Sequence, residues 1–105
     1  MKQVFPHRFS AAVGMKVLRL AEAQLREKHP AIELATVWED QKSKVSFGFT
    51  ALSTRFTGSI TSKDRGLHLE MDVPTIFKAW VPLARQVIER EVGKWIARVE
   101  KGELG

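Results

Sequence analysis

The stretch "VSFGFTALSTRFTGSI", residues 45–60, decides the fold, because apolar and polar residues alternate in it on both sides of a short interruption. A period of two predicts β-strands with one apolar face. The apolar members of the two halves are Val45, Phe47, Phe49, Phe56 and Ile60. The sequence therefore predicts two strands joined as a hairpin.

A two-residue turn at Leu52–Ser53 gives this hairpin a register in which every apolar residue meets a suitable partner. An aromatic ring opposite a strand glycine covers the exposed backbone there. The predicted pairs are Phe49 with Phe56, Val45 with Ile60, and Phe47 with Gly58.

The alternation extends outward from the hairpin on both sides. From Ile32 to Trp38 and from Leu67 to Val73, every second residue is again mainly apolar. Turns at Asp40–Ser43 and Lys63–Gly66 join these strands to the hairpin. The predicted pairs are Glu39 with Lys44, Ile60 with Leu69, and Gly58 with Met71.

One helix is predicted before these four strands in the sequence, and another after them. Ser10 can cap a helix that ends at Lys28-His29-Pro30, and a short strand at Gln3–Phe5 precedes it. After a short turn at Thr75–Trp80, a second helix runs from Val81 to Glu100, with Leu83 and Val87 in or beside its apolar stripe. The order β-α-β-β-β-β-α predicts an α+β two-layer sandwich with an antiparallel meander and both helices on one face.

Length and composition favour one globular domain. A chain of 105 residues with 44% hydrophobic residues fits a single domain, 1–105, in which 101–105 is a frayed tail. The absence of cysteine excludes disulfides and indicates a reducing compartment. No apolar run approaches the roughly 20 residues that span a bilayer, so we expect no transmembrane segment and a cytoplasmic protein.

The net charge of +5 raises nucleic acid as a partner. Residues 1–28 hold six lysines and arginines against two acidic residues, so the excess lies in the first quarter and forms no concentrated stripe. The aromatic residues of the sheet share the face that the helices need for burial, which removes them as a base-stacking platform. A nucleic-acid-binding or regulatory domain is therefore the alternative, and a steep loss of affinity with salt would identify it.

His68, Glu70 and Asp72 share one strand face and are the one polar cluster in the sequence that could bind a metal or perform acid–base chemistry. An antiparallel sheet covered on one side also shows such residues to water, and we favour that interpretation. The sequence has no glycine-rich nucleotide loop and no nucleophile elbow. We expect no cofactor and no enzymatic activity.

The same sheet face also carries small residues. This face is either exposed to solvent or is the contact surface of a homodimer, and we favour solvent exposure. They are Ala35, Val37, Ser46, Gly48, Thr50, Thr57, Ser59 and Thr61.

The connector between Val73 and the last helix gathers large apolar residues next to cations. It either plugs the open end of the sandwich or forms an exposed apolar patch that binds a partner or a hydrophobic surface. Its candidate binding residues are Ile76, Phe77, Lys78, Trp80 and Arg85.

Several of these motifs together resemble the polyhydroxyalkanoic acid system protein family, small bacterial proteins that occur near polyhydroxyalkanoate genes. The resemblance spans nearly the whole chain. Its most specific pieces are Pro6-His7 with Ser10, the hairpin from Phe47 to Gly58, and Asp72-Val73-Pro74. The chain departs from the family in having no glycine in the hairpin turn and a longer segment between Pro74 and Pro82.

The resemblance implies a non-enzymatic accessory protein of polyester storage that binds the granule surface or a granule-associated protein. It implies no catalytic residue. A third class of function, a small-molecule carrier with a cavity between sheet and helices, would show itself as ligand-dependent stabilisation.

Overall fold

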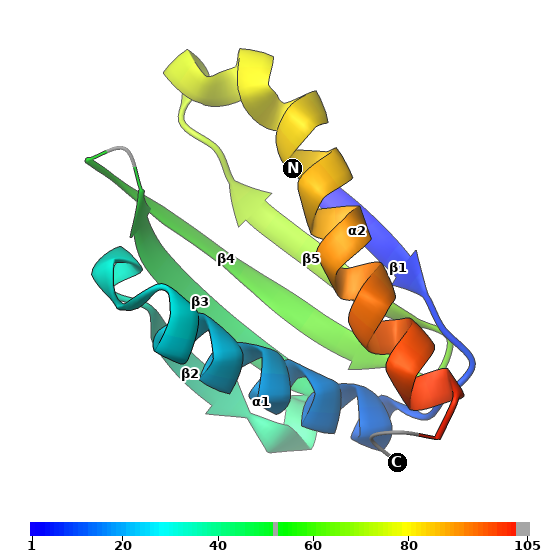
Figure 1. Cartoon of the computed structure of the whole chain (residues 1–105). Helices are drawn as coiled ribbons and strands as arrows, with labels where there is room; N and C mark the ends of the chain where they lie inside the picture. Colours follow the sequence, from blue (N-terminus) through cyan, green and yellow to red (C-terminus); the bar gives the residue numbers. More distant parts are fainter. Residues whose placement is uncertain (52, 103–105) are drawn as a thin grey trace.

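A computed structural model describes residues 1–51 and 53–102 and shows an α+β fold (Figure 1). A five-stranded antiparallel sheet is combined with two long helices and three 3₁₀ segments. The strands are β1 Lys2–Pro6, β2 Ala35–Glu39, β3 Lys44–Ala51, β4 Thr54–Lys63 and β5 Gly66–Asp72. The helical segments are α1 Ala11–Lys28, η1 Pro30–Ile32, η2 Asp40–Lys42, η3 Thr75–Trp80 and α2 Val81–Glu100. The predicted fold class and order of elements are confirmed.

The predicted registers of the central strands are also confirmed. The pairs include Phe49 with Phe56, Phe47 with Gly58, Ile60 with Leu69, and Glu39 with Lys44. A Cβ placed on Gly58 would lie 2.5 Å from the backbone oxygen of Glu70 and 2.8 Å from the Phe47 ring, so the ring does cover this glycine. Of the predicted hairpin turn, Leu52 lies outside the described residues, and Ser53 has a left-handed φ of 58°.

The sheet order β1-β5-β4-β3-β2 puts the first strand beside the last. Phe5 of β1 faces Leu67 of β5, and Lys2 faces Glu70. Strand propensity alone does not specify this pairing, because it joins segments more than sixty residues apart.

The helix boundaries follow the predicted signals. Ser10 caps α1, since its hydroxyl accepts a hydrogen bond of 3.3 Å from the backbone N–H of Val13. The backbone N–H of His29 closes the other end by donating to the carbonyl of Leu25. η3 and α2 have the predicted bounds, with Pro82 in the first turn of α2, where it removes no helical hydrogen bond.

One strand boundary was predicted wrongly. β2 begins at Ala35 and not at Ile32, because Pro30 starts the 3₁₀ turn η1 and Glu33 takes a left-handed conformation with φ of 52°. An extended strand cannot pass through such a residue.

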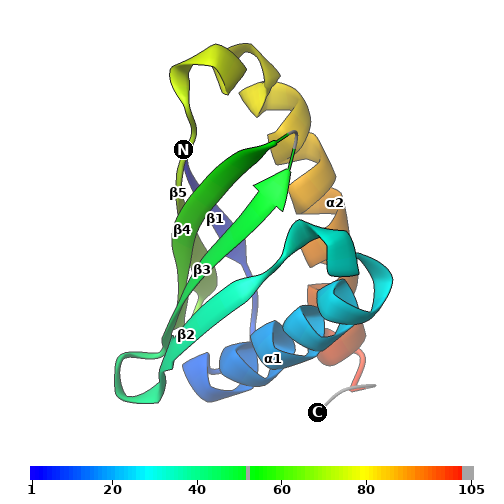
Figure 2. The ribbon, with the colours of Figure 1, turned by 90° about the vertical axis from the view of Figure 1, so that its left-hand side faces the viewer.

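Figure 2 shows α1 and α2 on the same side of the sheet. The two helices form a V (Figure 1). The N-terminal end of α1 and the C-terminal end of α2 lie close together, and a hydrogen bond of 3.1 Å from the Arg8 backbone N–H to the Glu100 carboxylate joins these ends. The opposite ends of the helices diverge. We call the two ends of the sandwich the closed end and the open end.

The core lies toward the closed end. Gly14 lets α1 approach β4 so closely that a Cβ in its place would overlap the hydroxyl of Ser62, which donates a 2.8 Å hydrogen bond to the carbonyl of Ala11. The buried cluster consists of Phe5, Met15, Leu18, Val45, Leu67, Leu69 and Ile96. Contrary to the predicted stripe, Leu83 and Val87 are exposed, because Val81 and Ile88 form the inward face of this part of α2 and the helical period turns Leu83 and Val87 away from it.

Candidate functional site

An apolar groove opens between the sheet and the two diverging helices. Its volume is about 520 Å³. It is lined by one face of the sheet, by α1, α2 and η3, and by the segment around η1. The side chains that line its floor are Val45, Phe47, Phe49, Ala51, Phe56, Ile60, Leu69, Met71 and Val73, and those of its walls include Leu18, Ala21, Leu25, Ile32, Leu34, Phe77, Trp80, Val81 and Ile88.

Aromatic rings form a continuous row along the groove. The centroids of Phe47 and Phe49 lie 6.2 Å apart, those of Phe49 and Phe56 lie 5.3 Å apart, and Phe77 of η3 follows at 5.5 Å from Phe56. Rings at such distances attract each other beyond the burial of their area. The row therefore fixes the shape of the floor and connects it to η3.

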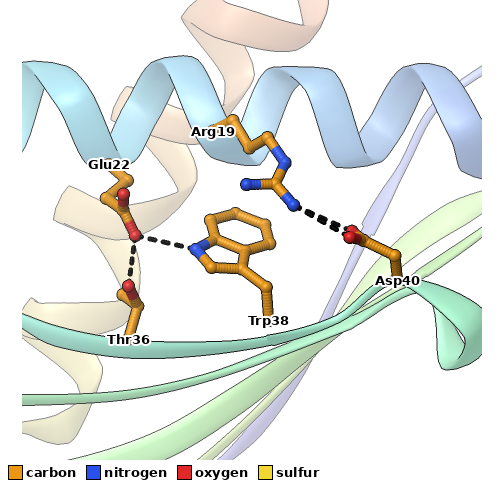
Figure 3. Close-up of polar contacts among 5 residues, drawn as sticks. All are labelled: Arg19, Glu22, Thr36, Trp38 and Asp40. Atoms are coloured by element: carbon orange, nitrogen blue, oxygen red, sulfur yellow. Dashed lines mark hydrogen bonds and ion pairs between the residues drawn. The ribbon is translucent and has the colours of Figure 1, made fainter.

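A polar network joins α1 to β2 along one wall of the groove (Figure 3). The Glu22 carboxylate accepts a hydrogen bond of 3.0 Å from the indole N–H of Trp38 and another from the hydroxyl of Thr36. The Arg19 guanidinium lies 4.2 Å above the Trp38 ring and forms two hydrogen bonds, of 2.9 and 3.1 Å, with the carboxylate of Asp40. These contacts hold the C-terminal half of α1 at a fixed distance from the sheet edge.

The same network explains why the groove is apolar in character. Among the described residues that line the groove, Glu22 and Thr36 carry polar side chains without an aromatic ring. They hydrogen-bond to each other. The indole N–H of Trp38 is used on Glu22 as well. The groove thus presents carbon atoms and aromatic faces to any ligand.

Next to the groove, η3 and the start of α2 expose an apolar patch. We define the apolar patch as Ile76, Trp80 and Leu83, whose side chains are 77%, 60% and 56% exposed. Ile76 and Trp80 belong to η3 and Leu83 to the first turn of α2, so the three exposed side chains lie within eight residues of one another in the chain. Trp80 belongs to both features, since it also lines the groove.

The remaining candidate residues of the connector lie in different surroundings. Phe77 is half-buried against Phe56 and lines the groove, so it belongs to the interior of the open end. Lys78 is exposed on η3, and Arg85 is exposed on α2, where its guanidinium donates a 3.2 Å hydrogen bond to the carbonyl of Lys2. The connector is therefore neither wholly core nor wholly surface.

His68, Glu70 and Asp72 lie on the sheet face that the helices leave open, opposite Thr61, Ser59 and Thr57 of β4. Within residues 1–51 and 53–102, no group of three histidine, cysteine or acidic side chains is placed to hold a metal ion. The spacing along one strand is the reason, because alternate residues are roughly 6.5 Å apart and nothing converges on them.

The placement of the sheet aromatics bears on the nucleic-acid alternative. Phe47, Phe49 and Phe56 line the groove beneath the helices, whereas Ser46, Gly48 and Thr57 lie on the opposite face. A single-strand binder needs its aromatics on an accessible surface. This arrangement gives that alternative no support.

His7 is a buried histidine at the closed end. Its ring stacks on Phe9 with centroids 3.8 Å apart, and neither ring nitrogen has a hydrogen-bond partner among residues 1–51 and 53–102. Burial lowers the pKa of His7, an effect that backbone groups of Phe9 and Gly66 and the carboxylates of Glu100 and Asp64 oppose.

The sequence identified the apolar face that lines the groove and raised a cavity between sheet and helices as one possibility, but it did not say where along the sheet the cavity lies. One signal for its position was the combination of large rings on β3 and β4 with a small residue, Ala21, on α1. Such a pattern does not by itself say where two helices diverge.

A scan against protein-family models, a search of curated proteins and a search of solved structures each find no match for this chain. No helix in the described part of the chain is long and apolar enough to cross a membrane.

Proposed function

We propose that this chain is a non-enzymatic accessory protein of polyhydroxyalkanoate storage that attaches to the polyester granule surface through the apolar patch. The observation that carries the proposal is the exposure of three large apolar residues, Ile76, Trp80 and Leu83, within eight residues of the chain at the open end. The family resemblance of the sequence supplies the nature of the surface. Under this proposal the protein acts in the cytoplasm, at the granule.

The physical argument is that a contiguous exposed apolar patch commonly marks a contact site. Fully burying a large aliphatic or aromatic side chain contributes about 1.5–3 kcal/mol. Tryptophan suits a boundary between apolar material and water because its ring is apolar and its N–H stays hydrated. Burial of these three side chains therefore favours attachment without requiring any charge on the surface.

The nearby cations add a second, weaker component. Lys78 and Arg85 are exposed beside the patch and would contact acidic groups on a granule coat. Salt screens exposed charges over about 8–10 Å at ordinary ionic strength, whereas apolar burial is not screened. Attachment through the patch is therefore expected to survive high salt.

The test is co-sedimentation of the purified protein with polyhydroxybutyrate particles at low and at high salt. The wild-type protein should pellet at both. The double variant Ile76→Ser/Leu83→Ser should stay in the supernatant, because it removes two of the three anchors. Neither residue lines the groove, so this variant leaves the groove intact.

Val37→Ser is the matched control, since Val37 is 64% exposed on the open sheet face, far from the patch in the fold. It should pellet like the wild type. Failure of the wild type to pellet, or equal pelleting by the double variant, would rule out direct attachment through the patch. Unchanged thermal unfolding of both variants establishes that the fold is retained.

A further inference from the structure

The groove at the open end is too large and too well formed to be a packing defect. Protein interiors are close-packed, with few voids larger than a water molecule. A volume of about 520 Å³ falls within the 300–1,000 Å³ typical of small-molecule sites. The wall network of Glu22, Trp38 and Thr36 ties α1 to β2 along one side of this groove.

The lining restricts the chemistry of the occupant. The polar atoms of Glu22, Thr36 and Trp38 are already paired with one another, and the Met1 ammonium, which also lines the groove, donates a 2.7 Å hydrogen bond to the carbonyl of Met71, so the lining offers few donors for an ester, amide or hydroxyl. Burying a polar group of the ligand without a hydrogen-bond partner costs roughly 1–3 kcal/mol of binding free energy. An unsubstituted hydrocarbon chain incurs no such loss.

The length of the floor suits one extended chain. Val45 and Ala51 are six residues apart in β3, which is about 20 Å along a strand. An extended aliphatic chain can lie along this length and, unlike an extended peptide segment, brings no backbone N–H or C=O groups that would need partners in an apolar groove.

We infer that the groove binds the alkyl chain of a fatty acid, with the carboxylate left in water at the opening. Lys78 is an exposed cation between the groove-lining residues Phe77 and Trp80, and it is suitably charged to accompany that carboxylate. This site shares Trp80 with the apolar patch, but Ile76 and Leu83 take no part in lining it, so variants at those two residues distinguish it from the attachment proposed above.

Isothermal titration of the full chain with octanoate, dodecanoate and hexadecanoate tests the inference. One molecule should bind per chain. Affinity should rise by roughly fourfold for each added methylene until the groove is filled, because each buried methylene contributes about 0.8 kcal/mol. A 3-hydroxybutyrate trimer should bind more weakly than an alkyl chain of equal length, since its esters find few donors.

Leu25 and Leu20 provide a matched pair of variants. Both lie on α1 and are 42% and 40% exposed, but Leu25 lines the groove and Leu20 does not. Leu25→Glu should weaken hexadecanoate binding by roughly tenfold or more, because the chain would have to desolvate a carboxylate. Leu20→Glu should leave it within about twofold. Both sites tolerate a charge without unfolding because they already contact water.

A second pair checks the site by filling it. Ala21 lines the groove and Ala23 is exposed on the same helix. Ala21→Phe should abolish binding, and Ala23→Phe should not. Equal effects within either pair, affinity independent of chain length, or a dimer that Leu25→Glu dissociates would overturn the inference. Loss of fatty-acid binding in Leu25→Glu with normal pelleting on polyester particles would separate this site from the apolar patch.

Discussion

The closed and open ends of this sandwich contain the same sheet and the same two helices, yet they are covered to very different extents. At the closed end, Gly14 and Ser62 allow α1 to touch β4, and Leu67 beneath them is 2% exposed. At the open end, Leu25 and Leu83 remain partly in water. The size of the residues between helix and sheet decides how closely the layers approach.

This difference separates stability from binding along one molecule. Buried apolar contacts at the closed end anchor the fold, because burial of apolar area is the dominant favourable term in folding. The open end keeps its apolar surface available, at a cost in local packing. Substitutions at the two ends should therefore have opposite consequences for unfolding and for binding.

The largest effect is expected from truncating the core at the closed end. Leu67→Ala should lower the free energy of unfolding by about 2–5 kcal/mol, because it leaves a cavity among Phe5, Met15 and other buried side chains. Leu83→Ala, the same change at the open end, should cost about 0.5 kcal/mol or less. Urea denaturation measures both, and comparable losses would contradict the division into two ends.

A second prediction concerns the contact that brings α1 and β4 together. Gly14→Ala should destabilise by about 1–3 kcal/mol, since its methyl would overlap the Ser62 hydroxyl and lie 3.2 Å from the Leu67 side chain. Gly93→Ala in α2 is the control, because a Cβ there meets no atom within 4 Å. It should stabilise by about 0.5–1 kcal/mol through helix propensity. Thermal unfolding of the two variants in opposite directions would support the contact, and parallel shifts would refute it.

The third prediction concerns acid sensitivity at the closed end. Because the folded-state pKa of His7 is lowered below 6.5 by burial, the folded protein binds a proton there less readily than the unfolded chain. The stability contribution is therefore complete above pH 6.5 and is lost as the pH falls through the folded pKa. The slope from one group is at most about 1.4 kcal/mol per pH unit.

His7→Phe should remove this dependence and keep the stacking on Phe9. The measurement is the urea midpoint of wild type and variant between pH 7.5 and pH 5. His29→Gln, at the exposed C-terminal end of α1, is the control and should follow the wild type. If the slope of stability against pH is unchanged in His7→Phe, another group causes the loss of stability in acid.

Much of the sheet could be predicted because its information is local. The alternation around Phe47 and Phe49 and the short turns fix the register of β3 and β4 within twenty residues. The bounds of η3 and α2 followed from Pro74 and Pro82, which permit few backbone conformations.

The rest depends on distant contacts. The pairing of β1 with β5 and the divergence of α1 from α2 arise only when the whole chain is assembled. The predicted start of β2 was wrong because Glu33 adopts a left-handed conformation, which its residue type does not indicate. Ile76, Phe77 and Trp80 could be singled out from the sequence as large apolar residues of the connector, but their division between surface and groove depends on where η3 sits relative to Phe56.

The smallest effect is expected at the wall of the open end, where Arg19 lies over Trp38 and pairs with Asp40. Arg19→Ala should cost about 0.5–1 kcal/mol, because exposed ion pairs and exposed cation–π contacts are each weak. The loss should shrink at high salt. Lys16→Ala, one turn earlier on the exposed side of α1, controls for the change in helix charge and should be nearly neutral. If Arg19→Ala instead cost several kcal/mol, the wall would be part of the cooperative core, and the open end would be as firmly anchored as the closed one.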